Sequence, residues 1–168
     1  SRSPAITKSG ALYYPLWLIY AALYSSKQGH NVSFLDAPAK QLNEEQSLNI
    51  IRKTDNEHSL FVLDTSTPSI KSDVAFAGKL KALYPHSFVV LGEYDCIVNE
   101  LANVLDAGKD LREVRGLCFW DGKEFVRTAP MPPMKNLDDL PFASQFIKEH
   151  LNERDYFFAA ATYPSIQI

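Results

Sequence analysis

Residues 59–69, SLFVLDTSTPS, are the most informative stretch of this chain about its fold class. The apolar run at their start does not alternate with polar residues, which is typical of a strand covered on both faces. A loop rich in hydroxyl side chains follows, and apolar residues at helical spacing come next. Strand, polar loop and helix in this order predict a parallel sheet with a ligand-binding crevice at its carboxyl edge.

The same order of elements occurs on both sides of this stretch. We predict further strands at 31–36 and 87–91 and helices at 15–27, 43–54, 69–84 and 96–107. Asn43 and Ser69 are expected to cap two of the helices with their side chains, and Gly29 to end the first one. The pattern predicts an α/β fold, a flavodoxin-like (Rossmann-like) parallel sheet with helices on both faces.

The pattern changes after residue 110. Asp121, Gly122 and Lys123 stand between two short apolar segments and predict a β-hairpin. Three prolines at 130–133 predict an extended linker, and a short closing helix is expected at 144–152. We therefore expect an α/β domain at 1–110, and at 111–168 a hairpin and linker that lead to a domain absent from the chain.

Composition excludes several classes of function. Of the 168 residues 46% are hydrophobic, and the net charge of −3 with scattered basic residues predicts no nucleic-acid surface. The most apolar stretch, 11–23, is too short to cross a bilayer, so we expect no membrane association. Cys96 and Cys118 have no paired spacing and are interpreted as small buried groups in a reducing cytoplasm. The four histidines have no metal-ligand spacing, so no metal site is predicted.

Seven short motifs follow one another along nearly the whole chain. They are Tyr14–Leu18, Gly29–Val32, Leu35–Ala37, Asp64–Ser69, Gly92–Asp95, Arg115–Leu117 and Asn136–Phe142. In this order and spacing the chain resembles the N-terminal cobalamin-binding domain and linker of cobalamin-dependent radical S-adenosylmethionine enzymes. The group it resembles most is the magnesium-protoporphyrin monomethyl ester oxidative cyclase-like, or Fe–S oxidoreductase, family.

The resemblance implies cobalamin as a small-molecule cofactor in this domain. It also implies a following radical S-adenosylmethionine barrel, the domain's own partner, which would hold a [4Fe–4S] cluster and S-adenosylmethionine. The parent enzyme would be a methyltransferase or a cyclase/oxidoreductase. The chain ends at Ile168, before the three-cysteine loop of that barrel, so this part alone is expected to hold no catalytic residues.

Three departures from the family pattern stand out. The family's first strand and loop are not recognisable here, and its glycine-rich loop is missing between Leu91 and Gly92, which are adjacent. The Asp-x-His-x-x-Gly motif of methionine-synthase-type cobalamin domains is also absent. Cobalamin is therefore expected in the base-off form, with no histidine on the cobalt.

Residues at two strand ends are the candidate cofactor-binding site. They are Thr65, Ser66, Thr67, Pro68, Ser69, Gly92, Glu93 and Tyr94. Their hydroxyls and backbone N–H groups could hold the amide side chains or the nucleotide tail of a corrinoid. The alternative interpretation is that the first five form only a turn and a helix cap.

Other small-molecule modules remain alternatives. Asp36 and Asp64 end strands, as acidic residues do in a receiver domain, but no strand-end lysine follows Leu91. No Gly-x-Gly-x-x-Gly follows any strand, which argues against a dinucleotide-binding domain. A flavodoxin-like or receiver-like regulatory module, or a purely structural domain without a corrinoid, is the second hypothesis.

Overall fold

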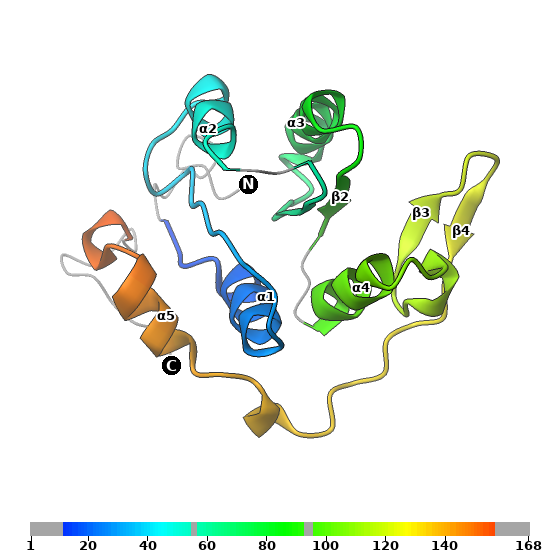
Figure 1. Ribbon diagram of the computed structural model, residues 1–168. Coiled ribbons are helices and arrows are strands. Elements are labelled where there is room, and N and C mark those ends of the chain that lie inside the picture. Colours follow the sequence, from blue (N-terminus) through cyan, green and yellow to red (C-terminus); the bar gives the residue numbers. More distant parts are fainter. Residues whose placement is uncertain (1–11, 55–56, 93–95, 157–168) are drawn as a thin grey trace. The chain divides into compact units, whose positions relative to one another are not determined.

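The computed structural model of the chain describes residues 12–54, 57–92 and 96–156. The chain forms two compact units, and each is described by itself. The first unit comprises residues 1–16, 34–93 and 144–168, and the second comprises residues 17–33 and 94–143. Figure 1 labels the helices and strands of both units. Among the described residues, no helix has the length and the apolar character needed to cross a membrane.

A two-stranded parallel sheet organises the first unit. Strands β1 (Leu60–Leu63) and β2 (Phe88–Leu91) pair in parallel, with Leu60 opposite Phe88. Both are short apolar runs without alternation, but their residues are half-buried rather than fully covered, and Phe88 is exposed. The α/β class, the parallel sheet and the hairpin that follows it in the chain are confirmed.

Helix α3 (Ile70–Leu83) packs against β2 and follows β1 in the chain (Figure 1). Its buried face holds Ala77 and Leu80, and Leu80 is fully buried. Removing such apolar side chains from water is the main contribution to the stability of the unit. The helix ends before Pro85, whose ring cannot continue it.

Helix α2 (Glu44–Ile51) begins at the predicted cap. The Asn43 side chain accepts a hydrogen bond from the Gln46 N–H, and the Gln46 side chain accepts one from the Asn43 N–H, both at 2.9 Å. This reciprocal pair satisfies two backbone donors at the helix start. An ion pair between Glu44 and Lys79 links α2 to α3.

The strand predicted at 31–36 is wrong, because this segment has no strand structure. A strand needs a neighbour whose N–H and C=O groups complete its ladder, and in the described part of the chain β1 and β2 pair only with each other. The end of the segment is held by side chains instead. The ring of Phe34 packs edge-on against Phe146, with ring centres 5.1 Å apart.

A buried polar cluster closes the first unit. Helix α5 (Ala143–His150) and the 3-10 turn Glu153–Asp155 precede Tyr156, whose hydroxyl donates to Asp36 Oδ2 at 2.6 Å. The other oxygen of Asp36 accepts from the Ala39 N–H at 3.2 Å. Asp36 is only 4% exposed, so these hydrogen bonds offset the cost of burying its carboxylate.

The ring of Tyr14 stacks on that of Tyr156, with ring centres 4.3 Å apart. The Tyr14 hydroxyl is buried and has no hydrogen-bond partner. Burial, and secondarily the negative charge of Glu153, raises the pKa of the Tyr14 phenol, because both disfavour the phenolate. The two tyrosines thus share a stacked pair but differ in whether the hydroxyl is bonded.

This difference gives a matched test of the cluster. Tyr156→Phe is expected to destabilise the protein by about 1–3 kcal/mol, because a buried carboxylate loses a donor. Tyr14→Phe is expected to change stability by less than about 0.5 kcal/mol or to stabilise, because its hydroxyl has no bond to lose. Chemical denaturation of both variants measures the two free energies, and equal losses would contradict the assignment.

The second unit contains helix α1 (Leu16–Lys27) from its second residue onward and helix α4 (Cys96–Asp106). Gly29, at φ +97°, ends α1 in the left-handed region as predicted. His30 follows it and reaches α4, with Nε2 3.1 Å from Asn103 Oδ1 and Nδ1 3.6 Å from Asp106 Oδ2.

The predicted hairpin is confirmed. Strands β3 (Cys118–Trp120) and β4 (Phe125–Arg127) pair antiparallel around the turn at Gly122. One prediction for this region is wrong: Cys118 is exposed rather than buried, and Cys96 is half-buried. The hairpin has only two strands, so one face stays open to solvent.

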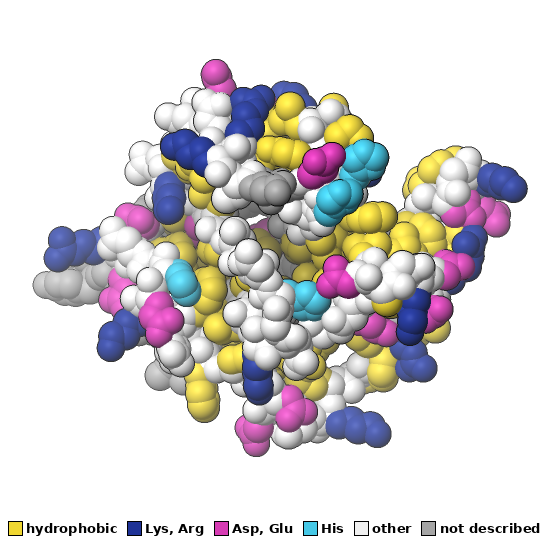
Figure 2. Space-filling view, viewed as in Figure 1, with side chains coloured by type: hydrophobic (Ala, Val, Ile, Leu, Met, Phe, Trp, Pro, Cys, Tyr) yellow, Lys and Arg dark blue, Asp and Glu magenta, His cyan; other side chains and the backbone are white. Residues whose placement is uncertain are grey.

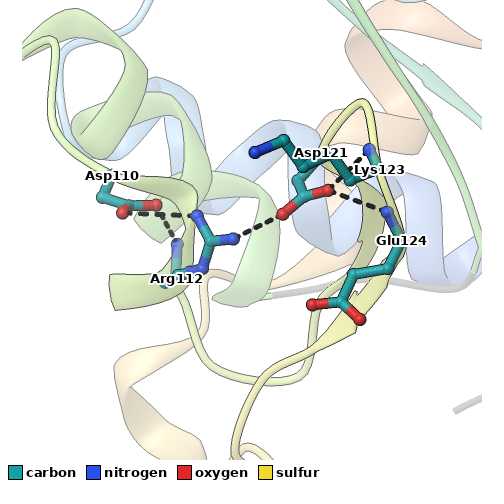
Figure 3. A network of polar contacts seen from close by, with 5 residues as sticks. All are labelled: Asp110, Arg112, Asp121, Lys123 and Glu124. Carbon is teal, nitrogen blue, oxygen red and sulfur yellow. Dashed lines mark hydrogen bonds and ion pairs between the residues drawn. The ribbon is translucent and has the colours of Figure 1, made fainter.

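A surface network fastens the hairpin turn (Figure 3). Asp121 Oδ1 accepts from the backbone N–H groups of Lys123 at 2.9 Å and Glu124 at 3.0 Å. Its Oδ2 accepts from Arg112 Nη2 at 2.6 Å, and Arg112 Nη1 lies 3.6 Å from Asp110. The Glu124 and Lys123 N–H groups, and then Arg112, lower the pKa of the Asp121 carboxyl.

We expect Asp121 in the hairpin turn to become protonated at a lower pH in the folded protein than in the unfolded chain. The pKa of Asp121 is lower folded than unfolded, so its stabilisation is present above the unfolded value of about 3.9. It is lost as the pH falls through the lower folded value. The amide NMR signals of Lys123 and Glu124 should report a midpoint below about 3.9. Asp121→Asn should abolish that titration, and its persistence in this variant would contradict the network.

Candidate ligand-binding edge of the parallel sheet

The parallel pairing brings the candidate residues of the first unit to one edge. Because β1 and β2 run in the same direction, the loop after Leu63 and the residue after Leu91 leave the sheet together. The Gly92 N–H donates to the Leu63 carbonyl at 3.1 Å and extends the ladder beyond β2. Loop 65–69 and Gly92 are therefore neighbours at the carboxyl edge, where open α/β sheets bind ligands.

The carboxylate of Asp73, in the first turn of α3, organises this loop. Its Oδ2 accepts from Thr65 Oγ1 at 2.7 Å and from Ser69 Oγ at 2.6 Å. The hydroxyls of Ser66 and Ser69 lie 3.0 Å apart. Three of the four predicted hydroxyls therefore bond to one another or to Asp73, and a ligand would have to share or replace these bonds.

Sequence reasoning missed Asp73, although a signal was present. Ser69 and Asp73 are four residues apart, a spacing that places both side chains on one face of a helix. The hydroxyl-rich loop could therefore have been assigned a carboxylate partner on the following helix.

The predicted side-chain cap at Ser69 is wrong. Ser69 has helical backbone angles, φ −103° and ψ −8°, and its side chain makes no cap hydrogen bond. A capping side chain needs an extended backbone to reach the free N–H groups of the first turn. Ser69 is instead 2% exposed, and its hydroxyl bonds to Asp73.

Thr67 and Pro68 are the exposed part of the loop and face outward. They are the positions that a ligand at this edge would meet first. Glu93 and Tyr94, the remaining predicted site residues, lie outside the described residues. The structure thus brings Thr65–Ser69 and Gly92 to one edge of the sheet.

No described histidine of the first unit lies at this edge of the sheet. His58 precedes β1 and His86 precedes β2, so both belong to the amino edge, and His150 ends α5. In the described part of the chain no group of three or more His, Cys, Asp or Glu could hold a metal ion. The groups at the carboxyl edge suit hydrogen bonds to amides, hydroxyls or phosphates rather than metal ligation.

No protein-family model matches the chain, and no solved structure matches it significantly. The chain is similar to a protein of Pyrococcus horikoshii named as an uncharacterized methyltransferase. The two are 26% identical over 155 residues, which cover 77% of this chain and 33% of the relative. The chain thus spans about a third of the length of that relative. Cobalamin and radical chemistry stay predictions.

The hydrogen bonds of the loop predict unequal effects of two substitutions. Ser69→Ala should cost about 1–3 kcal/mol of stability, because the half-buried Asp73 carboxylate loses a donor. Thr67→Ala should stay within about 0.5 kcal/mol, as is usual for exposed sites. Denaturant unfolding measures both, and a Ser69→Ala effect as small as that of Thr67→Ala would show that Asp73 does not hold the loop.

Proposed function

We propose that this chain is the cobalamin-binding part of a radical S-adenosylmethionine methyltransferase. The observation that carries the proposal is the parallel register of β1 and β2, which places loop 65–69 beside Gly92. The order of the family-like motifs and the similarity to a methyltransferase-named protein of greater length support it. A cyclase or oxidoreductase reaction of the parent enzyme is the variant of this proposal.

The groups at the carboxyl edge fit a corrinoid with many amide side chains. Thr67 is open to solvent, and backbone N–H groups of the loop could donate to the amide oxygens of a corrinoid. Gly92 has no side chain to obstruct a flat ring. With His58 and His86 at the opposite edge, neither can serve as a lower ligand there, in keeping with base-off binding. Bound cobalamin would supply a methyl group or electrons.

The other two cofactors belong outside this chain. A [4Fe–4S] cluster of the radical family needs three cysteines on one loop, and the chain has two cysteines, 22 residues apart. We therefore assign the cluster and S-adenosylmethionine to a following barrel, which is also the proposed partner of this domain. We also propose a cytoplasmic location for the protein.

The proposal is tested by loading the protein with hydroxocobalamin. After desalting, the chain is expected to retain corrinoid absorbance close to one equivalent. Thr67→Trp, which places a bulky ring at the carboxyl edge, should reduce retention about tenfold or more, in line with the loss of about 1.4 kcal/mol or more. No retention by the unmodified chain would overturn the proposal.

His86→Trp is the matched control, because it adds the same exposed ring at the amino edge of the same sheet. It should retain as much corrinoid as the unmodified chain. Equal losses in the two variants would show that retention does not depend on the carboxyl edge. Circular dichroism checks that both variants keep the fold.

A purely structural role is the second candidate function. Its support is the Asp73 network, because Thr65 and Ser69 are bonded inside the protein rather than presented to a ligand. If the loop has only a structural role, desalting should remove all hydroxocobalamin from the protein. The same experiment therefore separates the two candidates.

A further inference from the structure

Two histidines that are distant in sequence lie together at the amino edge of the parallel sheet. The ring centres of His58 and His86 are 5.7 Å apart, and the ring planes are inclined by 31°. Both side chains are exposed, and Figure 2 shows two adjacent histidine side chains on the surface. Their sequence separation of 28 residues is unlike any local metal-ligand spacing, so only the fold unites them.

The register of the sheet explains the pair. His58 stands two residues before Leu60, His86 stands two residues before Phe88, and Leu60 lies opposite Phe88. The Phe88 N–H donates to the Ser59 carbonyl at 2.9 Å, which continues the pairing toward the histidines. Equivalent positions on neighbouring strands carry side chains on the same face. The backbone therefore holds the two rings side by side.

The turn that carries His86 is firmly anchored. Ser87 is fully buried, and its hydroxyl donates to the Tyr84 carbonyl at 2.6 Å. The ammonium group of Lys81 donates to the carbonyls of Pro85 at 2.8 Å and Ser87 at 2.5 Å. These bonds fix the backbone on both sides of His86. A ligand at the pair would thus meet a site that needs little ordering on binding.

The separation of the rings matches a shared metal ion. Two imidazoles that bind one tetrahedral ion at the usual N–metal distance of about 2.0–2.1 Å have ring centres about 5 Å apart. The observed distance between the ring centres is 5.7 Å, and a small rotation of either side chain would bring it to this value. Imidazole nitrogens suit Zn²⁺, Ni²⁺ and Cu²⁺. Because both rings are exposed, water can complete the coordination.

We infer that His58 and His86 form a two-histidine site for a divalent transition-metal ion at the amino edge of the sheet. The ion bridges the starts of β1 and β2 and stabilises the folded chain, because it binds the two rings only when the strands are paired. The site lies at the edge opposite to the proposed corrinoid and does not depend on it.

Titration of the untagged chain with Ni²⁺, followed by calorimetry, tests the site. Both cysteines are first alkylated so that thiols do not compete. One ion per chain is expected, and His58→Ala and His86→Ala should each weaken binding by roughly tenfold or more. His150→Ala, which removes an exposed histidine elsewhere, is the control and should bind as the unmodified chain does.

NMR supplies a second readout. Ni²⁺ should broaden the ring signals of His58 and His86 at lower metal concentration than those of His30 and His150. It should also raise the melting temperature of the unmodified chain and not that of His58→Ala. The inference is overturned if Ni²⁺ does not bind, if binding survives both substitutions, or if all four histidines broaden together.

Discussion

The in-register parallel pairing of β1 with β2 is the constraint on which both candidate sites depend. With Leu60 opposite Phe88, every residue at one end of a strand has a partner at the same end of the other. The carboxyl ends bring loop 65–69 to Gly92, and the amino ends bring His58 to His86. A slip of one residue would turn every side chain of the shifted strand to the other face and separate both groups.

At the carboxyl edge, the carboxylate of Asp73 orders the hydroxyl-rich loop that precedes α3. Asp73 accepts hydrogen bonds from the hydroxyls of Thr65 and Ser69. Its charge lies near the N-terminus of α3, where a negative charge is favourable. The same bonds limit what the loop can offer to a ligand. Thr67 and the backbone remain accessible, so recognition there would rest on backbone N–H groups and shape more than on the full set of side-chain hydroxyls.

Two other polar arrangements show how burial sets the importance of a hydrogen bond. The Tyr156 hydroxyl and the Asp36 carboxylate bond inside the core, where an unpaired charge would be costly. Arg112 and Asp121 meet at the surface, where water and salt weaken their attraction. The bond between Tyr156 and Asp36 therefore stabilises the core of the first unit, whereas the ion pair between Arg112 and Asp121 orders only the hairpin turn.

Features that depend only on neighbouring residues could be predicted from the sequence. The cap at Asn43, the end of α1 at Gly29 and the hairpin turn at Gly122 follow from local backbone preferences, and the apolar runs identify β1 and β2. Tertiary structure decided what depends on partners far along the chain, because spacing alone does not reveal which groups meet. Residues 31–36 lack a strand because no neighbouring strand completes their ladder, while Tyr156 reaches Asp36 and His58 reaches His86 only because the fold brings these segments together.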